Sequence, residues 1–396
     1  MPKGALTNLK VLDLTTYRAG PYCTKLLADF GAEVIKIEKP ATGDPMRSIG
    51  PFVDNKPGLE RSIPFHWLNT NKQSITLNLQ SRELFDELLS KVDVLVESFS
   101  PEDKKKWNLD YARINKINPS LIMTSISNFG QTGPYQDYQA EEIVINAMSG
   151  SMMATGDHDR QPLCPGPAVA QYTAGLHAYL GTLIALFRRG ISSEGDHVDV
   201  SIHESALENI ELQLVGYLHH GKVARRNNDE HLLVPWQLQA CQDGYVAAIG
   251  APVRHWLKAA PMFEEPRLLE EPYRHMSGRI QHRQEFEALF KPWLERHNKK
   301  DIYHMGQSRG LSFGHLASLA EAFQSKQHEA RNFFVETEPH PVVGTLRICS
   351  SPFRGSSSSW QTGRAPLLGE HNEQIYGNLL NYSATELAHL KEEGAI

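Results

Sequence analysis

Residues 9–37, LKVLDLTTYRAGPYCTKLLADFGAEVIKI, carry the pattern from which the fold class is predicted. Residues 9–14 are a short apolar run, which predicts a strand. Residues 21–30 place apolar side chains at helical spacing, so they predict a helix with one apolar face. Residues 34–37 form a second apolar run and predict a second strand. This order of elements predicts a β-α-β unit with parallel strands.

The same alternation continues along the chain. A second helix is predicted over residues 82–91, and further strands are predicted over residues 74–79, 92–96, 121–126 and 198–202. A doubly wound parallel sheet is the natural closure of these elements. Residues 170–188 are small or apolar throughout and contain Gly175 and Gly181, so they predict a buried helix that packs closely against other backbone.

The character of the sequence changes after Gly221. Asp243-Gly244 predicts a turn between two short strands, and polar helices are predicted over much of residues 254–334. These features indicate a second structural unit.

Composition excludes several classes of protein. Lys and Arg number 40 against 46 Asp and Glu, a net charge of −6 over 396 residues, so no nucleic-acid partner is expected. No stretch approaches the roughly 18 apolar residues of a membrane span, and residues 1–8 lack a signal pattern. We therefore expect a cytoplasmic protein without a membrane partner. The four cysteines and the histidines lack ligand spacing, so no metal site is predicted.

Motifs for common enzyme classes are missing, but basic side chains are predicted near the sheet. The sequence has no Walker A motif, no G-x-G-x-x-G after the first strand and no G-x-S-x-G. Residues 15–21 predict a turn and a helix N-terminus, which either binds an anion or only caps the helix. Basic and amide residues are predicted at strand ends or loops: Arg18, Lys36, Lys39, Asn71, Lys72 and residues 104–106. Several lysines at one sheet edge could hold a phosphorylated cofactor; the alternative is a solvated face.

Short motifs then match one known family in order along nearly the whole chain. They are NLKVLDL at 8–14, RAGP at 18–21, LADFGAEVIKIE at 27–38, GD at 43–44, NK at 71–72, VESF at 96–99, GQTGP at 130–134, AMSG at 147–150, YTAG at 172–175, DGY at 243–245 and RAPLLGEH at 364–371. By these motifs the chain resembles the family III CoA-transferases, which include formyl-CoA and carnitine CoA-transferases and α-methylacyl-CoA racemase.

The resemblance implies a fold, an assembly and a cofactor. It implies a large α/β domain with a Rossmann-like core, built from residues 1–220 and 331–396, and a smaller α+β domain over residues 221–330. Two subunits would form an interlocked homodimer. Coenzyme A is implied as an acyl-CoA substrate. The positions that match the family's CoA contacts are Arg18, Lys39, Asn71, Lys72, Ser98 and Lys106. Lysine charges and helix N-termini suit the phosphates of CoA.

The chain departs from the family at the catalytic position. The transferases attack the thioester with an Asp, and that position here is Gln171. A neutral amide is a weak nucleophile, so the family's double displacement is not expected to run on Gln171. The racemase branch uses a His and an Asp, which match Glu141 and Gln171. Glu141 therefore remains as a carboxylate base if it is partly desolvated; the alternative is a solvated loop residue. Glu142 matches a family Asp and could instead serve as a helix cap.

These residues predict an acyl-CoA-processing enzyme that also binds a small-molecule acceptor. Three alternatives stay open. In the first, Glu141 or Glu142 replaces the lost Asp in CoA transfer. In the second, an epimerase, dehydratase, decarboxylase or direct acyltransferase uses Glu141 as the base and Gln171 to hold the thioester oxygen. In the third, the protein binds CoA without catalysis.

Overall fold

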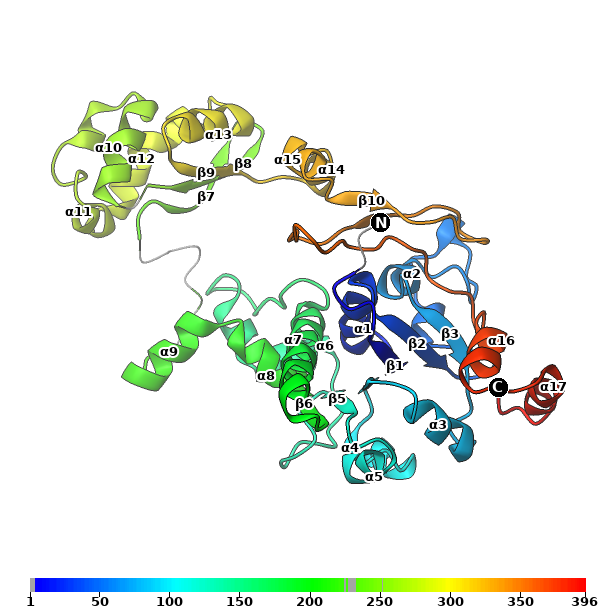
Figure 1. The fold of residues 1–396 in the computed structure, drawn as a ribbon. Coiled ribbons are helices and arrows are strands. Elements are labelled where there is room, and N and C mark those ends of the chain that lie inside the picture. Colours follow the sequence, from blue (N-terminus) through cyan, green and yellow to red (C-terminus); the bar gives the residue numbers. More distant parts are fainter. Residues whose placement is uncertain (1–3, 224–225, 227–232, 251) are drawn as a thin grey trace. The chain divides into compact units, whose positions relative to one another are not determined.

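The computed structural model describes residues 4–223, 226, 233–250 and 252–396 (Figure 1). The chain divides into two compact units. The larger comprises Met1–Thr155, Leu163–Ala224 and Glu329–Ile396. The smaller comprises Gly156–Pro162 and Arg225–His328.

The large unit is built on a six-stranded parallel sheet. Its strands are β1 (Lys10–Leu14), β2 (Glu33–Glu38), β3 (Gln73–Thr76), β4 (Val94–Glu97), β5 (Ile122–Ser127) and β6 (Asp196–Ser201). They lie in the order β3-β2-β1-β4-β5-β6, and every neighbouring pair is parallel. This confirms the predicted α/β class with its doubly wound sheet. The chain winds outward from β1 in one direction and from β4 in the other, which creates a topological switch point between these two strands.

Helices cover both faces of the sheet, because successive strand residues point to opposite sides. Leu12, Leu95 and Met123 belong to one apolar core, whereas Val11 and Val94 belong to the other. The first core includes side chains of α3 (Arg82–Leu89), α5 (Tyr111–Ile117) and α17 (Ala384–Glu392). The second includes side chains of α1 (Ala19–Asp29), α7 (Val169–Ser192) and α8 (Ile202–Glu208).

The C-terminal segment returns to the large unit beside β3 (Figure 1). The Asn372 side chain accepts a hydrogen bond from the Thr76 amide at 2.8 Å, and the Tyr376 hydroxyl donates to the Thr76 carbonyl oxygen at 2.8 Å. The other elements of this unit are η1 (Pro45–Ser48), η2 (Val53–Asn55), α2 (Ile63–Leu68), α4 (Pro101–Lys106), α6 (Glu142–Met148), η3 (Ser151–Ala154), α9 (Glu211–His220), β10 (Phe334–Glu336), β11 (Arg347–Cys349), α16 (Asn372–Gln374) and the π-helical turn η6 (Ile375–Leu379).

The small unit has its own core around an antiparallel sheet of β7 (Trp236–Cys241), β8 (Gly244–Ile249) and β9 (Ser312–His315). The predicted turn at Asp243-Gly244 joins β7 to β8. Large aromatic side chains, including Trp256, Phe286 and Phe290, fill the core. The helices here are α10 (Val253–Ala259), η4 (Ala260–Phe263), η5 (Pro266–Leu269), α11 (Met276–Gln281), α12 (Arg283–Leu294), α13 (Lys299–Ser308) and α14 (Leu319–Phe323); α15 (Lys326–Ala330) spans the boundary between the units.

The long helix α7 confirms one prediction and corrects another. A Cβ on Gly175 would lie 2.5 Å from the Ala19 carbonyl oxygen, so α7 approaches α1 as closely as expected. The prediction of a buried helix is wrong for its other face. Five large side chains are exposed along that face: Leu176, Leu180, Ile184, Phe187 and Ile191. An apolar helix pattern indicates burial, but it does not say whether the covering surface belongs to the same chain.

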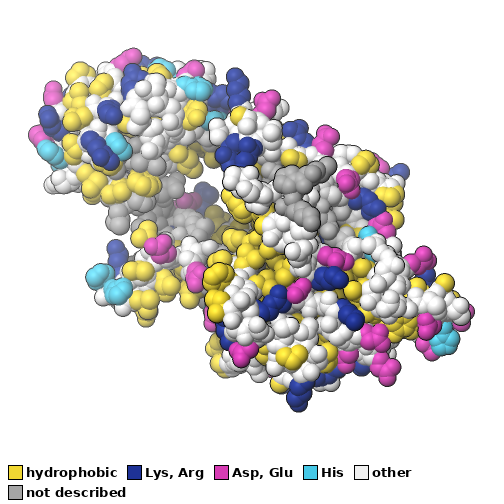
Figure 2. All heavy atoms as spheres, viewed as in Figure 1, with side chains coloured by type: hydrophobic (Ala, Val, Ile, Leu, Met, Phe, Trp, Pro, Cys, Tyr) yellow, Lys and Arg dark blue, Asp and Glu magenta, His cyan; other side chains and the backbone are white. Residues whose placement is uncertain are grey.

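Figure 2 shows hydrophobic side chains at the surface over α7 and α9. None of the helices in the described ranges is sufficiently long and apolar to cross a membrane.

Candidate active site

A cavity of about 460 Å³ lies at the carboxyl ends of β1, β4 and β5. It is lined by the turn after β1, by Ser98 and its neighbours after β4, and by the end of β5. Parallel α/β sheets bind ligands at this place, where the strand order reverses. The cavity brings together four of the predicted site residues, Arg18, Ser98, Glu141 and Gln171. We call it the switch-point cavity.

A buried aspartate fixes the turn after β1. Asp13 accepts hydrogen bonds from the Thr15 amide at 3.0 Å, the Thr24 hydroxyl at 2.7 Å and the Lys72 ammonium at 2.9 Å. Burial by itself raises the pKa of Asp13, but Lys72 and Lys36 outweigh it and hold the pKa below its usual range. Asp13 is therefore a charged anchor beneath the cavity.

A second buried pair holds the next residues of the turn. The Lys36 ammonium donates to the Thr15 carbonyl oxygen at 2.8 Å and pairs with Asp44 at 2.8 Å. Burial lowers the pKa of Lys36, but the nearby carboxylates, Asp44 foremost, raise it overall. The Thr16 amide donates to the Ser98 hydroxyl at 3.0 Å, which joins the turn to the loop after β4. Lys36 was predicted at a strand end, but it lies buried within β2 and serves this turn.

The start of α1 gives the cavity a positive end. Arg18 is the N-cap residue, but its side chain makes no capping bond, and the first turn of α1 contains no acidic residue. Ala19 and Gly20 begin the helix and line the cavity. Among the described residues, the Arg18 guanidinium has no hydrogen-bond or ion-pair partner. A helix N-terminus and an arginine at one cavity favour an anion or a developing negative charge.

Glu141 and Glu142 separate at the start of α6. The Glu142 Oε1 atom accepts hydrogen bonds from the Ala170 amide at 2.8 Å and from the Asn146 side chain at 3.0 Å. Its Oε2 atom is buried and has no hydrogen-bond partner in the described part of the chain. Glu142 thus holds the beginning of α7, directly before Gln171. Glu141 is the exposed N-cap residue of α6 and lines the cavity, so this chain alone leaves it solvated, as in the alternative stated above, and a role as a base requires a bound ligand or a second subunit to cover it.

The comparisons with known proteins agree with this geometry. Residues 6–372 match the model of CoA-transferase family III. The chain belongs to this family. It is 33% identical to a formyl-CoA:oxalate CoA-transferase of Streptomyces avermitilis, over 99% of both chains. It is 32% identical to a succinyl-CoA–D-citramalate CoA-transferase of Chloroflexus aurantiacus, over 100% of this chain and 99% of the relative.

Solved structures give the same result. A CaiB/BaiF family protein of Brucella suis superposes with a TM-score of 0.85 at 30% identity, covering 96% of this chain and 100% of that one. Rv3272 of Mycobacterium tuberculosis shares the fold, with a TM-score of 0.83 at 23% identity over 94% of this chain and 99% of that one. The chain is therefore a CoA-transferase-family enzyme, and coenzyme A as a thioester is the expected substrate.

Two of the CoA contacts implied by the family lie at the surface. Lys39 is exposed directly after β2, and Lys106 is exposed at the end of α4. Lys104 is buried, because its ammonium donates to the Ser125 hydroxyl at 3.0 Å and lies 3.2 Å from Glu97. Residues 104–106 therefore do not share one solvated face. Lys39 and Lys106 remain predicted phosphate contacts.

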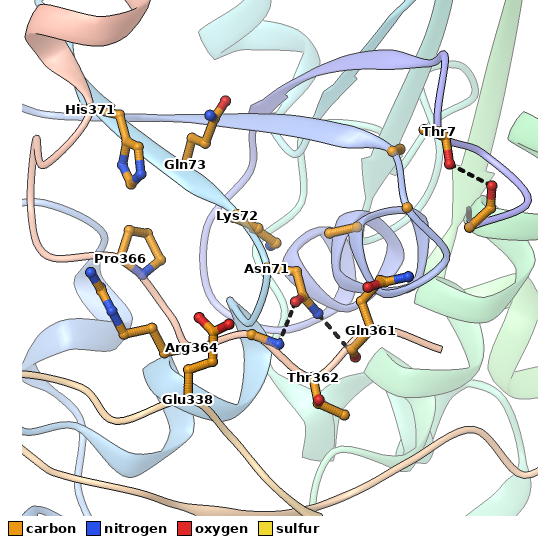
Figure 3. A pocket seen from close by; sticks show the side chains of 15 residues that line it. Thr7, Asn71, Lys72, Gln73, Glu338, Gln361, Thr362, Arg364, Pro366 and His371 are labelled. Carbon is orange, nitrogen blue, oxygen red and sulfur yellow. Dashed lines mark hydrogen bonds between the residues drawn. The ribbon is translucent and has the colours of Figure 1, made fainter. Parts of the chain in front are cut away.

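The last two implied contacts lie at the amino end of β3, where they line a separate cavity of about 770 Å³ (Figure 3). Asn71 accepts a hydrogen bond from the Gly363 amide at 2.6 Å and donates to the Gln361 carbonyl oxygen at 3.3 Å. The Lys72 ammonium has four partners, at 2.7–3.0 Å: Asp13, Pro21, Thr24 and Asn69. Burial lowers the pKa of Lys72 to about 8, against the opposing effect of Asp13. Asn71 and Lys72 thus do not line the switch-point cavity with Arg18 and Ser98, although the Lys72 ammonium supports the turn beneath it through Asp13.

Sequence reasoning missed the buried charges that support the site. Asp13 stands in the apolar run of β1, and Lys36 stands in that of β2. Charged side chains in buried strands need a partner, so their position was a usable signal. The described residues contain no cluster of three or more potential metal ligands.

Proposed function

We propose that this protein binds an acyl-CoA thioester with its thioester group in the switch-point cavity and acts on it without an aspartyl nucleophile. The observation that carries this proposal is the presence of Gln171, an amide, in the first turn of α7 at that cavity. Arg18 and the N-terminus of α1 suit either the anionic phosphates of CoA or the negative charge that develops on the oxygen of a reacting thioester. Two relatives are named as transferases that take CoA from formyl-CoA or from succinyl-CoA. These names support a thioester substrate.

We assign Gln171 the task of holding the thioester oxygen. An amide N–H donates a hydrogen bond to an oxygen on which negative charge develops, and such a donor is worth about 3 kcal/mol in acyl-transfer sites. Gln171 lies in the first turn of a 24-residue helix, whose N-terminus favours the same charge.

Glu141 is the proposed base. It and Asp103 are the acidic residues that line the cavity. Asp103 already accepts a hydrogen bond from the Ser100 hydroxyl at 2.9 Å, whereas Glu141 has no hydrogen-bond partner for its side chain among the residues that the structure describes. Glu142 does not suit the role of nucleophile, because Oε1 is engaged by α7 and Oε2 is buried. The environments of Glu141 and Glu142 therefore favour proton abstraction or direct acyl transfer over covalent CoA transfer.

We also propose that the enzyme is a homodimer, with the exposed stripe of α7 at the interface. Leu176, Leu180, Ile184, Phe187 and Ile191 follow one another along a single helix face, and Phe187 is 77% exposed. A second copy of the chain would bury these side chains, and an apolar stripe of this kind is typical of a protein–protein interface. Light scattering of Phe187→Glu should show a loss of dimer.

The deciding experiment restores the carboxylate. We expect Gln171→Asp to gain CoA transfer or thioester hydrolysis, because Asp supplies the missing nucleophile. Gln171→Asn is the matched control, since it has the size of Asp without the charge, and it should gain nothing. Hydroxylamine should trap an acyl-enzyme in Gln171→Asp and not in the natural protein.

The natural protein should incorporate deuterium at the α-carbon of a thioester if Glu141 removes a proton there. A hydroxylamine-sensitive acyl-enzyme in the natural protein would instead show that another carboxylate performs covalent transfer. CoA binding without either signal would favour a non-catalytic role.

A further inference from the structure

A smaller apolar cavity shares the lining residue Arg18 with the switch-point cavity, and the proposed function does not use it. Its volume is about 350 Å³. Ile63, Trp67, Ala168, Tyr172 and Ile348 are among the side chains that line it. Arg18 lines both cavities, and the consecutive residues Gln171 and Tyr172 line one each. Arg18 is therefore common to the two cavities, and Tyr172 follows directly after Gln171, the residue assigned to the thioester oxygen.

Aromatic rings form a firm wall of this apolar cavity. The rings of Trp67 and Tyr172 meet edge to face, with centroids 5.5 Å apart. Tyr22 stacks on Trp67 at 5.8 Å and meets Tyr172 edge to face at 5.1 Å. Burial raises the pKa of the Tyr172 and Tyr22 phenols. Such a wall favours an apolar group, and pairs of this geometry accept a further ring well.

Arg18 supplies a positive charge at the junction of the two cavities. Its guanidinium has no hydrogen-bond or ion-pair partner in the described residues, although it is partly buried. A guanidinium fits a carboxylate through two parallel hydrogen bonds. The junction therefore offers a carboxylate site with an apolar space behind it.

We infer that the apolar cavity holds the hydrocarbon body of a carboxylic acid whose carboxylate binds Arg18. The substrate acid of this enzyme is then an apolar monocarboxylic acid, with an aromatic ring or a branched chain. It differs from oxalate and citramalate, which appear in the names of the relatives. The acid binds Arg18 in its free form, as the acceptor or as the acid released from a thioester, because a monocarboxylic acid bound to CoA has no carboxylate left. That role rests on the proposed function; the binding of the free acid at Arg18 does not.

The energetics favour this class of acid. An apolar body that enters the cavity gains about 25 cal/mol per Å² of surface removed from water. A second carboxylate placed against Trp67, Tyr172 and Ile348, inside the cavity, would lose its hydration without gaining a partner there. The other cation that lines the cavity, Arg347, lies at the exposed rim and already interacts within the protein, its guanidinium lying over the Phe334 ring at 5.8 Å. Dicarboxylates are therefore the critical comparison.

The experiment measures binding of free acids to the full-length protein by ligand-observed NMR, without CoA. We expect phenylacetate to bind about tenfold or more tightly than succinate or oxalate. Ile63→Trp places a larger side chain in the cavity from a position that is 36% exposed, so it should fold normally. It should weaken phenylacetate binding about tenfold and leave acetate unchanged. Ile280→Trp, at a 43% exposed position on α11 in the small unit, is the matched control and should change neither.

Other outcomes would overturn the inference or the function separately. Succinate or oxalate binding as tightly as phenylacetate would overturn the inference, as would an Ile63→Trp variant that weakens acetate and phenylacetate alike. If phenylacetate binds as expected but neither phenylacetyl-CoA nor succinyl-CoA is bound or consumed, the acid site stands and the proposed function fails. If succinyl-CoA is consumed but phenylacetate is not used as an acceptor and phenylacetyl-CoA is not consumed, the function stands and the inference fails.

Discussion

The two ends of the parallel sheet use similar polar residues in opposite ways. At the carboxyl end, Arg18, Glu141 and Gln171 turn toward a cavity, and Arg18 has no partner among the described residues. At the amino end, Asn71 and Lys72 line a larger cavity, but their polar atoms are bound within the protein (Figure 3). Cavity size and residue type therefore do not distinguish a ligand site from a structural one. The absence of an internal partner does.

The largest expected effect concerns the amino end. Lys72→Met should lower the free energy of unfolding by about 3–5 kcal/mol, because it leaves Asp13 buried without its cation. Urea unfolding followed by circular dichroism measures this. Lys39→Met, which removes an exposed lysine, is the control and should stay within about 0.5 kcal/mol.

A double variant separates pairing from a role in CoA binding. Adding Asp13→Asn to Lys72→Met removes both charges, so it should recover part of the lost stability. If Lys72→Met keeps full stability and weakens CoA binding, Lys72 is a ligand contact and the contrast between the two ends of the sheet is wrong.

The sequence allowed the elements near the switch point to be predicted, because their patterns are local. The strands β1, β2, β4 and β5 and the helix α1 follow from apolar periodicity within single segments. The role of Lys72 could not be predicted, because its partner Asp13 lies 59 positions away. Asn71 and Gly363 are 292 positions apart. Such pairings depend on the finished fold.

The residues at the carboxyl end were predicted from the family resemblance rather than from periodicity. Gln171, Arg18 and Ser98 stand in motifs with fixed places in the family, and the structure brings them to one cavity. The sequence did not show which of the two glutamates faces the cavity. Neighbouring residues at a helix start point in different directions, and the direction of each depends on where the helix begins. The apolar cavity beside Tyr172 combines segments that are far apart in the sequence, so no local pattern could indicate it.

A smaller effect distinguishes these neighbouring glutamates within the carboxyl end. Glu142→Ala should cost about 1 kcal/mol of stability, because it removes the acceptor for the Ala170 amide at the start of α7. Glu141→Ala should leave stability within about 0.5 kcal/mol and lower turnover about 100-fold or more if Glu141 is the base. Thermal unfolding and a thioester assay measure the two quantities.

Glutamine variants sharpen the same distinction. Glu142→Gln keeps an acceptor oxygen for Ala170 and should recover most of the stability, whereas Glu141→Gln keeps the size but not the basicity and should stay inactive. An inactive Glu142→Gln enzyme of normal stability, beside an active Glu141→Gln enzyme, would transfer the catalytic role to Glu142.

The smallest expected effect is a pH dependence at the amino end. Arg364 forms a two-point ion pair with Glu370, which also accepts a hydrogen bond from the Leu367 amide at 2.9 Å. The hydrogen bonds from Arg364 lower the pKa of Glu370 from 4.5 to about 2. Because the folded pKa is the lower one, the pair stabilises the protein fully above about pH 4.5, and this contribution is lost as the pH falls toward 2.

The magnitude should be about 1 kcal/mol or less, well below what the lowered pKa alone would give, because water reaches both side chains, which are 25% and 24% exposed, and screens the pair. The test compares urea unfolding of the natural protein and Glu370→Gln between pH 7 and pH 3. The difference should shrink as the pH falls, and it should be nearly absent at every pH in an Arg364→Met background. A difference that grows at low pH would contradict the pairing. Arg364 would then be a cation free to bind an anion in the larger cavity, and the amino end would have to be considered a ligand site as well.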